Sequence, residues 1–338
     1  MKSKTLKLFI IFLIVVIVGA ISLLLLTGHK EEPSMVLRIG YQPSTHHVAF
    51  LVAMEKGWWQ ERLKKFGVNE VKEYLFQTGP PEMSAMLAGE IDVAYVGVAP
   101  PITAIEEGLK AKIEASVQTN GSDLVVRKDF NYSGPASLKG AKIATFPSGS
   151  IQDTIIRKWL NQSGLDTEKD VTIYGMGPGE AVSALKANAV DAVFLPQPSP
   201  AIIESEGFGR SVEKSGKMWG GGHICCVLLI SDKLINQNPS LAEEIIKIHN
   251  DATEYVKLHI DEASEIYSRK MNVDLNIVKI SFASWDGDLI ADPHWATNST
   301  LDFAKSIYEL NKERYTRPLN QNELFNYSLW DKIYPSKK

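Results

Sequence analysis

The hydrophobic pattern after residue 35 predicts a strand, a loop and a helix in succession. Leu37–Tyr41 is a short apolar run with a β-branched residue, which indicates a strand. Gln42–His47 is polar and contains a proline, which favours a loop. Apolar residues then recur at helical spacing from Val48 to Trp59. This order is typical of the βα unit of a parallel sheet, in which ligands bind at the loop that follows the strand.

A similar pattern recurs roughly 100 residues later in the chain. Arg38–Ser44 and Lys142–Ser148 both read basic, Ile, small, two variable residues, Pro and Ser. Ser84–Asp92 and Ser183–Asp191 match each other in the same order along the chain. We therefore expect two α/β lobes of similar architecture, although any two βα units can resemble each other over a few residues.

The remaining pattern predicts further strands, two connections between the lobes and a largely helical C-terminal part. The connections are an interrupted extended segment at Thr119–Gly121 and the flexible segment Gly220–Gly222. We expect a signal anchor and tether over residues 1–34, lobe 1 over 35–122 and again over 228–338, and lobe 2 over 123–227. The strands expected after the first are Val71–Phe76, Ile91–Val96, Lys112–Gln118, Asp123–Arg127, Lys142–Phe146, Val171–Tyr174, Ala192–Leu195 and His223–Ile230.

Length and charge agree with two domains and limit the class of partner. The chain has 338 residues, 44% of them hydrophobic, and domains of about 150 residues would give two. Residues 1–30 contain four lysines and no acidic residue, so the remainder has eight more acidic than basic residues. An acidic surface without basic clusters argues against nucleic acid as the partner.

The N-terminal segment Leu8–Leu26 is apolar apart from Ser22, and lysines precede it. Its length is close to the about 20 residues that span a bilayer, and it exceeds the about 7–15 residues of a signal-peptide core. We therefore favour an uncleaved signal anchor, with a cleaved signal peptide as the alternative. The globular part would then face outward, attached through the tether Glu31–Ser34.

Sequence motifs of common enzyme classes are missing from the chain. There is no G-x-S-x-G elbow, Walker loop or H-E-x-x-H sequence. The glycine-rich segment Gly175–Gly179 lacks the spacing of a dinucleotide-binding loop. We therefore predict a protein that is not an enzyme and that needs no cofactor.

The two cysteines of the chain, Cys225 and Cys226, are adjacent in sequence. Neighbours on a strand point to opposite faces, so we expect two buried free thiols rather than a disulfide. A metal site could be drawn from His46, His47, His223, Cys225 and His294. Their spacings match no closed zinc motif, so we predict no metal site.

The segment Pro147–Ser150 is the second candidate binding loop. It precedes a predicted helix, and the free N–H groups and partial positive charge of a helix N-terminus favour anions. Ser148 or Ser150 is also a suitable N-cap, so the loop can be explained without a ligand. Facing Gln42–His47 across a cleft, it would hold an anion, and protonated His46 or His47 would strengthen binding as the pH falls through about 6.5.

Several motifs resemble one known family. They are R-I-G-Y-Q-P, A-M-E-K-G-W-W, L-A-G-E-I-D-V-A-Y-V-G, P-S-G-S and F-L-P-Q-P. Together they resemble the nitrate, sulfonate and taurine solute receptors of ABC importers, over residues 36–270 and more loosely in the C-terminal helices. The resemblance implies a type II periplasmic-binding fold, in which two α/β lobes close on a small ligand. We favour an anionic, sulfonate- or nitrate-like ligand, with a planar heterocycle stacked between aromatic and proline residues as the alternative. The resemblance also implies a monomer at the outer face of the membrane that partners with a permease and its ATPase.

The resemblance places ligand contacts in the loops after the first and third strands, in the first connection and in facing loops of lobe 2. The same superfamily includes pyrimidine-precursor synthases related to thiamine biosynthesis, and Gly222–Cys226 is faintly similar to their cysteine-rich segment. A pyrimidine-precursor binding protein or synthase of the same fold therefore remains the alternative, although the segment has too few cysteines for the synthase motif. The candidate ligand-binding residues are Gln42, Ser44, Thr45, His46, His47, Gly97, Val98, Pro100, Gln118, Asn120, Ser148, Gly149, Ser150, Gly177, Pro178, Gln197, Pro198 and His223.

Overall fold

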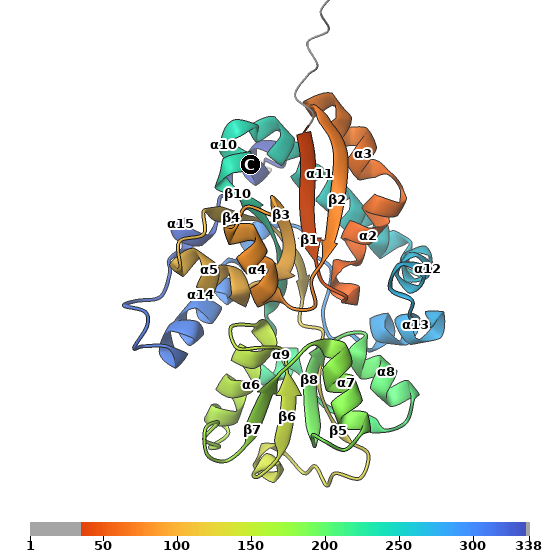
Figure 1. Cartoon of the computed structure of the whole chain (residues 1–338), viewed down its shortest axis with the longest axis vertical. Helices are drawn as coiled ribbons and strands as arrows, with labels where there is room; N and C mark the ends of the chain where they lie inside the picture. The colour runs from red at the N-terminus through yellow and green to blue at the C-terminus, as the bar shows by residue number, and fades with distance from the viewer. Residues whose placement is uncertain (1–34, 336–338) are drawn as a thin grey trace, which may run out of the picture. The chain divides into compact units, whose positions relative to one another are not determined.

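The computed structural model describes residues 35–335, which contain two five-stranded sheets with flanking helices (Figure 1). The prediction of a two-lobe α/β fold is confirmed. The first sheet has the order β2 (Val68–Leu75), β1 (Met35–Tyr41), β3 (Val93–Gly97), β10 (Ile224–Ser231) and β4 (Ala111–Thr119). The second sheet has the order β7 (Thr172–Gly175), β6 (Lys142–Thr145), β8 (Ala192–Pro196), β5 (Ser122–Arg127) and β9 (Gly209–Lys214).

Helices flank both sheets, and most of them follow the chain order that the sequence predicts. In the N-terminal part of lobe 1 they are η1 (Thr45–His47), α2 (Val48–Glu55), α3 (Trp58–Leu63), η2 (Lys64–Phe66), α4 (Gly79–Leu87) and α5 (Ala99–Glu106). In lobe 2 they are η3 (Pro135–Leu138), α6 (Ile151–Gln162), α7 (Pro178–Lys186), α8 (Ser199–Ser205) and α9 (Ser215–Met218). The C-terminal helices are α10 (Asp232–Gln237), α11 (Pro239–Leu258), α12 (Ile260–Met271), α13 (Leu275–Ser284), α14 (Pro293–Leu310), α15 (Gln321–Leu324) and α16 (Ser328–Ile333).

Both sheets are mixed, whereas the βα pattern alone predicts parallel sheets. In the first sheet β10 runs antiparallel to its neighbours β3 and β4, and in the second sheet β5 runs antiparallel to β8 and β9. These two strands are the first to enter each sheet after the chain crosses between lobes. Each entering strand begins where the parallel strands of its sheet end, because Cys226 pairs with Gly97 and Ser122 pairs with Pro196, so it runs opposite to them.

The repeated sequence pattern corresponds to repeated structure. β1 pairs in parallel with β3, and β6 pairs in parallel with β8. The aspartates that end the two matched segments make the same contact. Asp92 Oδ2 accepts from the backbone N–H of Arg38 at 3.1 Å, and Asp191 Oδ2 accepts from that of Lys142 at 2.9 Å. An aspartate at the end of each matched segment therefore holds the equivalent strand in each lobe.

The first connection between the lobes is short, with only Asn120 and Gly121 between β4 and β5. Gly121 has a φ of +83°, and a Cβ there would collide with the His46 ring and the Trp285 ring. Only glycine fits at this position. The second connection runs from β9 through α9 and Gly220–Gly222 into β10. Strand β9 is an addition to the sequence prediction, which placed no strand between Pro200 and Gly220.

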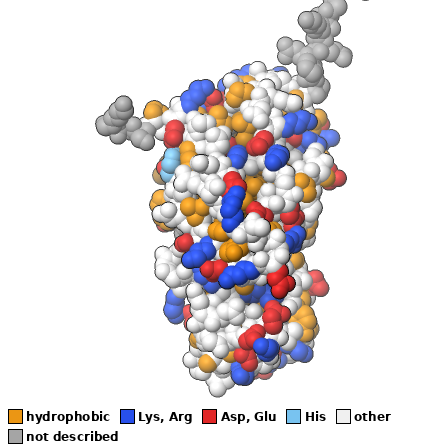
Figure 2. Space-filling model, turned by 90° about the vertical axis from the view of Figure 1, so that its left-hand side faces the viewer, with side chains coloured by type: hydrophobic (Ala, Val, Ile, Leu, Met, Phe, Trp, Pro, Cys, Tyr) orange, Lys and Arg blue, Asp and Glu red, His pale blue; other side chains and the backbone are white. Residues whose placement is uncertain are grey.

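On the face of the molecule shown in Figure 2, lysine and arginine side chains are interspersed with aspartate and glutamate. Among residues 35–335 no helix is both long enough and apolar enough to cross a membrane. The predicted anchor Leu8–Leu26 and the tether Glu31–Ser34 lie outside the described residues.

Candidate functional site

The loop after β1 reaches the end of β8 in the other sheet. Ser44 Oγ donates a hydrogen bond to the backbone carbonyl of Gln197 at 2.8 Å, and Thr45 N–H donates to the same oxygen at 3.2 Å. Gln197 N–H donates in turn to the carbonyl of Gly121 in the first connection at 3.1 Å. The predicted loops of lobe 1 and lobe 2 therefore meet at the crossing between the lobes.

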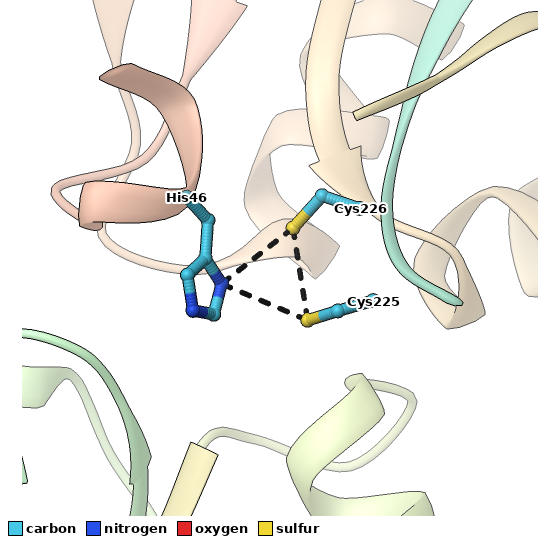
Figure 3. Close-up of side chains that lie close together, drawn as sticks. All are labelled: His46, Cys225 and Cys226. Carbon is cyan, nitrogen blue, oxygen red and sulfur yellow. Dashed lines mark hydrogen bonds between the residues drawn. The ribbon is translucent and has the colours of Figure 1, made fainter. Parts of the chain in front are cut away.

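His46 lies at the centre of this junction and is 1% exposed. Its Nε2 is 3.0 Å from the carbonyl oxygen of Gly121, and its ring stacks on Trp285 with centroids 5.3 Å apart and planes at 22°. A carbonyl oxygen only accepts, so Nε2 carries the proton of the neutral ring. The lone pair of Nδ1 then faces the sulfurs of Cys225 and Cys226 at 3.7 and 4.0 Å (Figure 3).

The side chains of Cys225 and Cys226 both point toward the His46 ring. The expectation that they lie on opposite faces of the sheet is therefore wrong. The pairing of β10 with β4 shifts register on both sides of Cys226, and this irregularity turns the two neighbours together. The thiols are free and buried, as predicted, with the sulfurs 3.8 Å apart. Gln118 Nε2 donates to the Cys226 sulfur at 3.6 Å.

The two thiols differ in acidity. Burial alone would raise the pKa of Cys225, but the hydrogen bond from the Cys226 thiol, together with the nearby His46 ring, brings it well below its ordinary value. Burial and the neighbouring Cys225 sulfur raise the pKa of Cys226 well above its ordinary value. Of the pair, Cys225 is therefore the more readily deprotonated.

Asn120 and His223 join the two connections between the lobes. His223 N–H donates to Asn120 Oδ1 at 2.8 Å, and Asn120 N–H donates to the His223 carbonyl at 3.0 Å. His223 Nδ1 lies 2.7 Å from the carbonyl of Ile224, which can only accept, so Nδ1 carries the proton. Burial lowers the pKa of His223, so the ring is neutral and Nε2 is an acceptor.

A segment that the sequence analysis did not select, between α13 and α14, completes the junction. Trp285 Nε1 donates to the carbonyl of Thr119 at 2.9 Å. Asp286 accepts through Oδ1 from Gly121 N–H at 2.9 Å and through Oδ2 from Gly216 N–H at 3.0 Å. The only sequence signal for this segment is an aspartate- and glycine-containing turn, S-W-D-G-D, inside a helical region.

His47 and Gln42 belong to the interior of lobe 1. His47 Nδ1 accepts from Gln42 N–H at 2.9 Å, and the Gln42 side chain donates to Glu82 Oε2 at 2.8 Å. Burial lowers the pKa of His47 to about 3. His47 is therefore neutral at pH 6.5, which contradicts the expectation that it could be protonated there.

The predicted loop Pro147–Ser150 occupies a different part of the boundary between the lobes. Ser148 and Gly149 line a cavity of about 570 Å³ together with Thr103 and Arg157, and a second of about 230 Å³ that Pro100 also lines. Ser150 is the N-cap of α6, because its Oγ accepts from the N–H of Asp153 at 3.1 Å. The ordinary capping role is thus present.

The other predicted residues lie at the ends of strands or helices. Val98 N–H donates to the carbonyl of Cys225 at 2.8 Å, and Gly97 is the register partner of Cys226. Gly177 precedes α7 and Pro178 begins it, while Pro198 is buried just before α8. Gly97 and Val98 therefore lie beside the two cysteines.

Several buried polar atoms of this junction have no hydrogen-bond partner among the described residues. Three belong to predicted binding residues: Gln118 Oε1, Gln197 Oε1 and His223 Nε2. Asp123 Oδ1, whose carboxylate also lies 3.5 Å from Gln197 Nε2, is a fourth. A buried polar atom without a hydrogen-bond partner lowers the stability of the folded state by about 1–3 kcal/mol. All four atoms are acceptors, so they suit a bound group that donates hydrogen bonds or carries positive charge.

Comparisons with known proteins agree with this architecture. A Bacillus subtilis (strain 168) protein named for binding aliphatic sulfonates is 30% identical over 257 residues, which cover 74% of each chain. The nitrate/nitrite binding protein NrtA of Nostoc sp. is 25% identical over 230 residues, 62% of this chain and 51% of that protein. The structure is similar to the alkanesulfonate-binding protein SsuA of Xanthomonas axonopodis pv. citri bound to MOPS, with a TM-score of 0.74 and 20% identity. That match covers 86% of this chain and 98% of the other.

The family model with the description NMT1-like family matches residues 30–269. This range includes β1 to β10, the loop of His46 and both cysteines. The chain belongs to the NMT1-like family.

Proposed function

We propose that the chain is an extracytoplasmic solute-binding receptor of an ABC importer, which captures a small sulfonate- or nitrate-like solute between two closing lobes. A receptor is favoured over a synthase, because the Bacillus subtilis and Nostoc relatives are both named as binding proteins. The chain would bind its solute without transforming it. The partners would be a permease and its ATPase.

The contact between the loop of Ser44 in lobe 1 and Gln197 in lobe 2 is the main structural support for this proposal. Residues predicted from both lobes meet where Ser44 and Thr45 contact Gln197. The buried acceptors of Gln118, Gln197 and His223 lie at this junction without hydrogen-bond partners among residues 35–335. A solute held there would satisfy them. Because these atoms accept hydrogen bonds, a sulfonate that also carries an amino group fits better than a bare anion.

Calorimetric titration of the full-length chain tests the proposal with a matched pair of solutes. Taurine and ethanesulfonate share the two-carbon sulfonate, and only taurine has the amino group. We expect binding of taurine at one site per chain and weaker binding of ethanesulfonate and nitrate. The absence of binding by any sulfonate or by nitrate would reject the receptor proposal for this solute class.

Variants of the two glutamines test the position of the site. Gln118→Leu and Gln197→Leu should each weaken taurine binding by roughly 10-fold or more, because a hydrogen bond from a charged group such as the ammonium of taurine contributes about 1.5–3 kcal/mol. Gln60→Leu is the control, since Gln60 is exposed on α3. Equal affinities of all three variants and the natural chain would place the solute elsewhere.

We also propose a type II periplasmic-binding arrangement with lobe boundaries near residues 122 and 227, a monomer, and attachment to the outer face of the membrane through Leu8–Leu26. Cell fractionation tests the attachment. We expect the full-length chain in the membrane fraction, with its N-terminus intact. Recovery in the soluble fraction with the N-terminus removed would favour a cleaved signal peptide instead.

A further inference from the structure

We propose that His46, Cys225 and Cys226 form a binding site for one thiophilic metal ion with a filled d shell, Cu⁺ or Zn²⁺. The proposal goes beyond the receptor function and does not depend on which solute the receptor carries. Its three ligand atoms would be His46 Nδ1 and the two cysteine sulfurs, which all lie within 4.8 Å of one another (Figure 3).

The separations of the three donor atoms match those around a bound metal ion. The two sulfurs are 3.8 Å apart, and they lie 3.7 and 4.0 Å from His46 Nδ1. Zinc–sulfur bonds of about 2.3 Å and zinc–nitrogen bonds of about 2.0–2.1 Å, opened by a tetrahedral or trigonal angle, put the donors about 3.5–4.0 Å apart. An ion could therefore bind with little movement of the side chains.

The backbone gives both sulfurs this orientation. On a regular strand one of two adjacent cysteines would point to the opposite face of the sheet. Here the shifted register of β10 against β4 on both sides of Cys226 brings both sulfurs to the loop of His46. A sulfur separation of 3.8 Å is far from the about 2.05 Å of a disulfide, so the pair is available as two thiols.

The surroundings of His46 are those of a metal-ligating histidine. Ligating imidazoles commonly donate their second N–H to a carbonyl or carboxylate, which fixes the tautomer and the ring orientation. The carbonyl of Gly121 takes this role at Nε2, and the stacked ring of Trp285 holds the plane of the imidazole. Nδ1 is thereby left with its lone pair toward the sulfurs.

The second cysteine is also supported by a neighbour. Gln118 Nε2 donates to the Cys226 sulfur, a contact that stabilises the negative charge of a thiolate. The polar atoms of the junction that have no hydrogen-bond partner among residues 35–335 are also acceptors, which suits a cation beside the two thiols. Two thiolates and one imidazole favour Cu⁺ or Zn²⁺ over the harder Mg²⁺ and Ca²⁺. Binding would release the protons of the thiols to solvent, without oxidation.

Metal titration of the full-length chain, reduced and freed of metal with a chelator, tests the proposal. Co²⁺ serves as the spectroscopic substitute for Zn²⁺, and Cu⁺ is titrated separately without oxygen. The chain has only two cysteines, so thiolate-to-metal charge-transfer absorption can come from no other residue. We expect this absorption to saturate at one ion per chain with at least one of the two metals.

X-ray absorption on the natural chain identifies the ligands without any substitution. The expected shell has two sulfurs and one nitrogen, with an additional light atom for Zn²⁺ and none required for Cu⁺. A folded, reduced chain that shows no charge-transfer absorption with either ion would overturn the proposal. A shell made only of nitrogen and oxygen would do the same.

Variants then separate ligands from neighbours. Cys225→Ser and Cys226→Ser should each abolish the two-sulfur shell, and His46→Gln should weaken metal affinity at least 10-fold. Gln118→Ala should weaken it by about 10- to 100-fold, the usual effect of losing a residue that supports a ligand. His294→Ala is the control, because that exposed histidine pairs with Asp292. If His294→Ala and His46→Gln weakened metal binding equally, His46 would not be a ligand.

Discussion

At the scale of single residues, Glu114 in β4 places an ionisable carboxyl group where burial disfavours its charged form. Its carboxyl accepts from Asn326 Nδ2 at 3.0 Å through Oε1, while Oε2 is buried without a partner among the described residues. Burial raises the pKa of Glu114 to about 8. Since the folded chain holds this proton more tightly than the unfolded chain, stability falls as the pH rises from about 4.5 through 8.

Glu114→Gln should therefore raise the stability of the protein at pH 8 and change it little at pH 4.5. The variant keeps an acceptor for Asn326 and removes the buried charge, so the expected gain near pH 8 is on the order of 4 kcal/mol. Thermal unfolding at both pH values measures it, with exposed Glu265→Gln as the control. A variant less stable than the natural chain at pH 8 would show that the carboxylate is favourably held.

His249 gives a pH dependence of the opposite sign. Its Nε2 lies 2.7 Å from the Ser116 carbonyl and its Nδ1 lies 3.2 Å from the Tyr95 hydroxyl, and burial lowers its pKa to about 4. The stability that depends on the neutral ring is present above pH 6.5 and is lost as the pH falls through 6.5 toward 4. His249→Gln should make the loss of unfolding free energy between pH 7 and 5 shallower by about 2 kcal/mol. A slope equal to that of the natural chain would contradict this assignment.

The candidate site was only partly predictable at this scale. His46 stands out because it follows a strand and lies in a polar loop, but nothing in the sequence distinguishes it from His47. The difference comes from packing: His47 turns into lobe 1, where it accepts from Gln42 N–H, and His46 turns to Gly121. The irregular register that aligns Cys225 with Cys226 has no signature in a run of apolar residues.

At the scale of secondary structure, α6 depends on its first turn. Ser150 caps the helix through its bond from Asp153 N–H. Ser150→Ala should lower the free energy of unfolding by about 1 kcal/mol, within the 0.5–2 kcal/mol usual for the loss of an N-cap. The melting temperature should fall by about 2–4 °C. Ser183→Ala, at an exposed position inside α7, should leave the free energy of unfolding unchanged or higher, because alanine is the better helix former. Equal losses for both variants would rule out a specific capping contribution.

Most strands were predictable because a buried strand needs a short apolar run between turn residues. β3 and β8 follow this rule, and their boundaries differ from the predicted ones by one or two residues. β9 does not follow it, since G-R-S-V-E-K is largely polar. It lies at the edge of its sheet, where it pairs only with β5, and such a strand needs few apolar residues.

At the scale of the whole molecule, Asp286 ties together the segments that connect the lobes. Its two carboxylate oxygens accept from Gly121 in the first connection and from Gly216 at the start of the second. Long-range contacts of this kind follow from tertiary packing, so sequence patterns that place the two connections do not reveal the residue that joins them. The sequence predicts the two connections only from the interrupted extended segment Thr119–Gly121 and the glycine run Gly220–Gly222.

Asp286→Ala should loosen this junction and favour an arrangement with the lobes further apart. Each hydrogen bond to a charged group contributes about 1.5–3 kcal/mol, and the affinity for solute falls in proportion to the fraction of chains that can close. We expect roughly 10-fold weaker taurine binding, and a larger radius of gyration by small-angle scattering in the absence of taurine.

Saturating taurine should reduce the radius of gyration of the natural chain and bring the variant back to the same value. Asp129→Ala, at a largely exposed aspartate, should behave like the natural chain. Scattering curves that do not change with taurine, in a chain that calorimetry shows to be saturated, would contradict closure of two lobes around the solute.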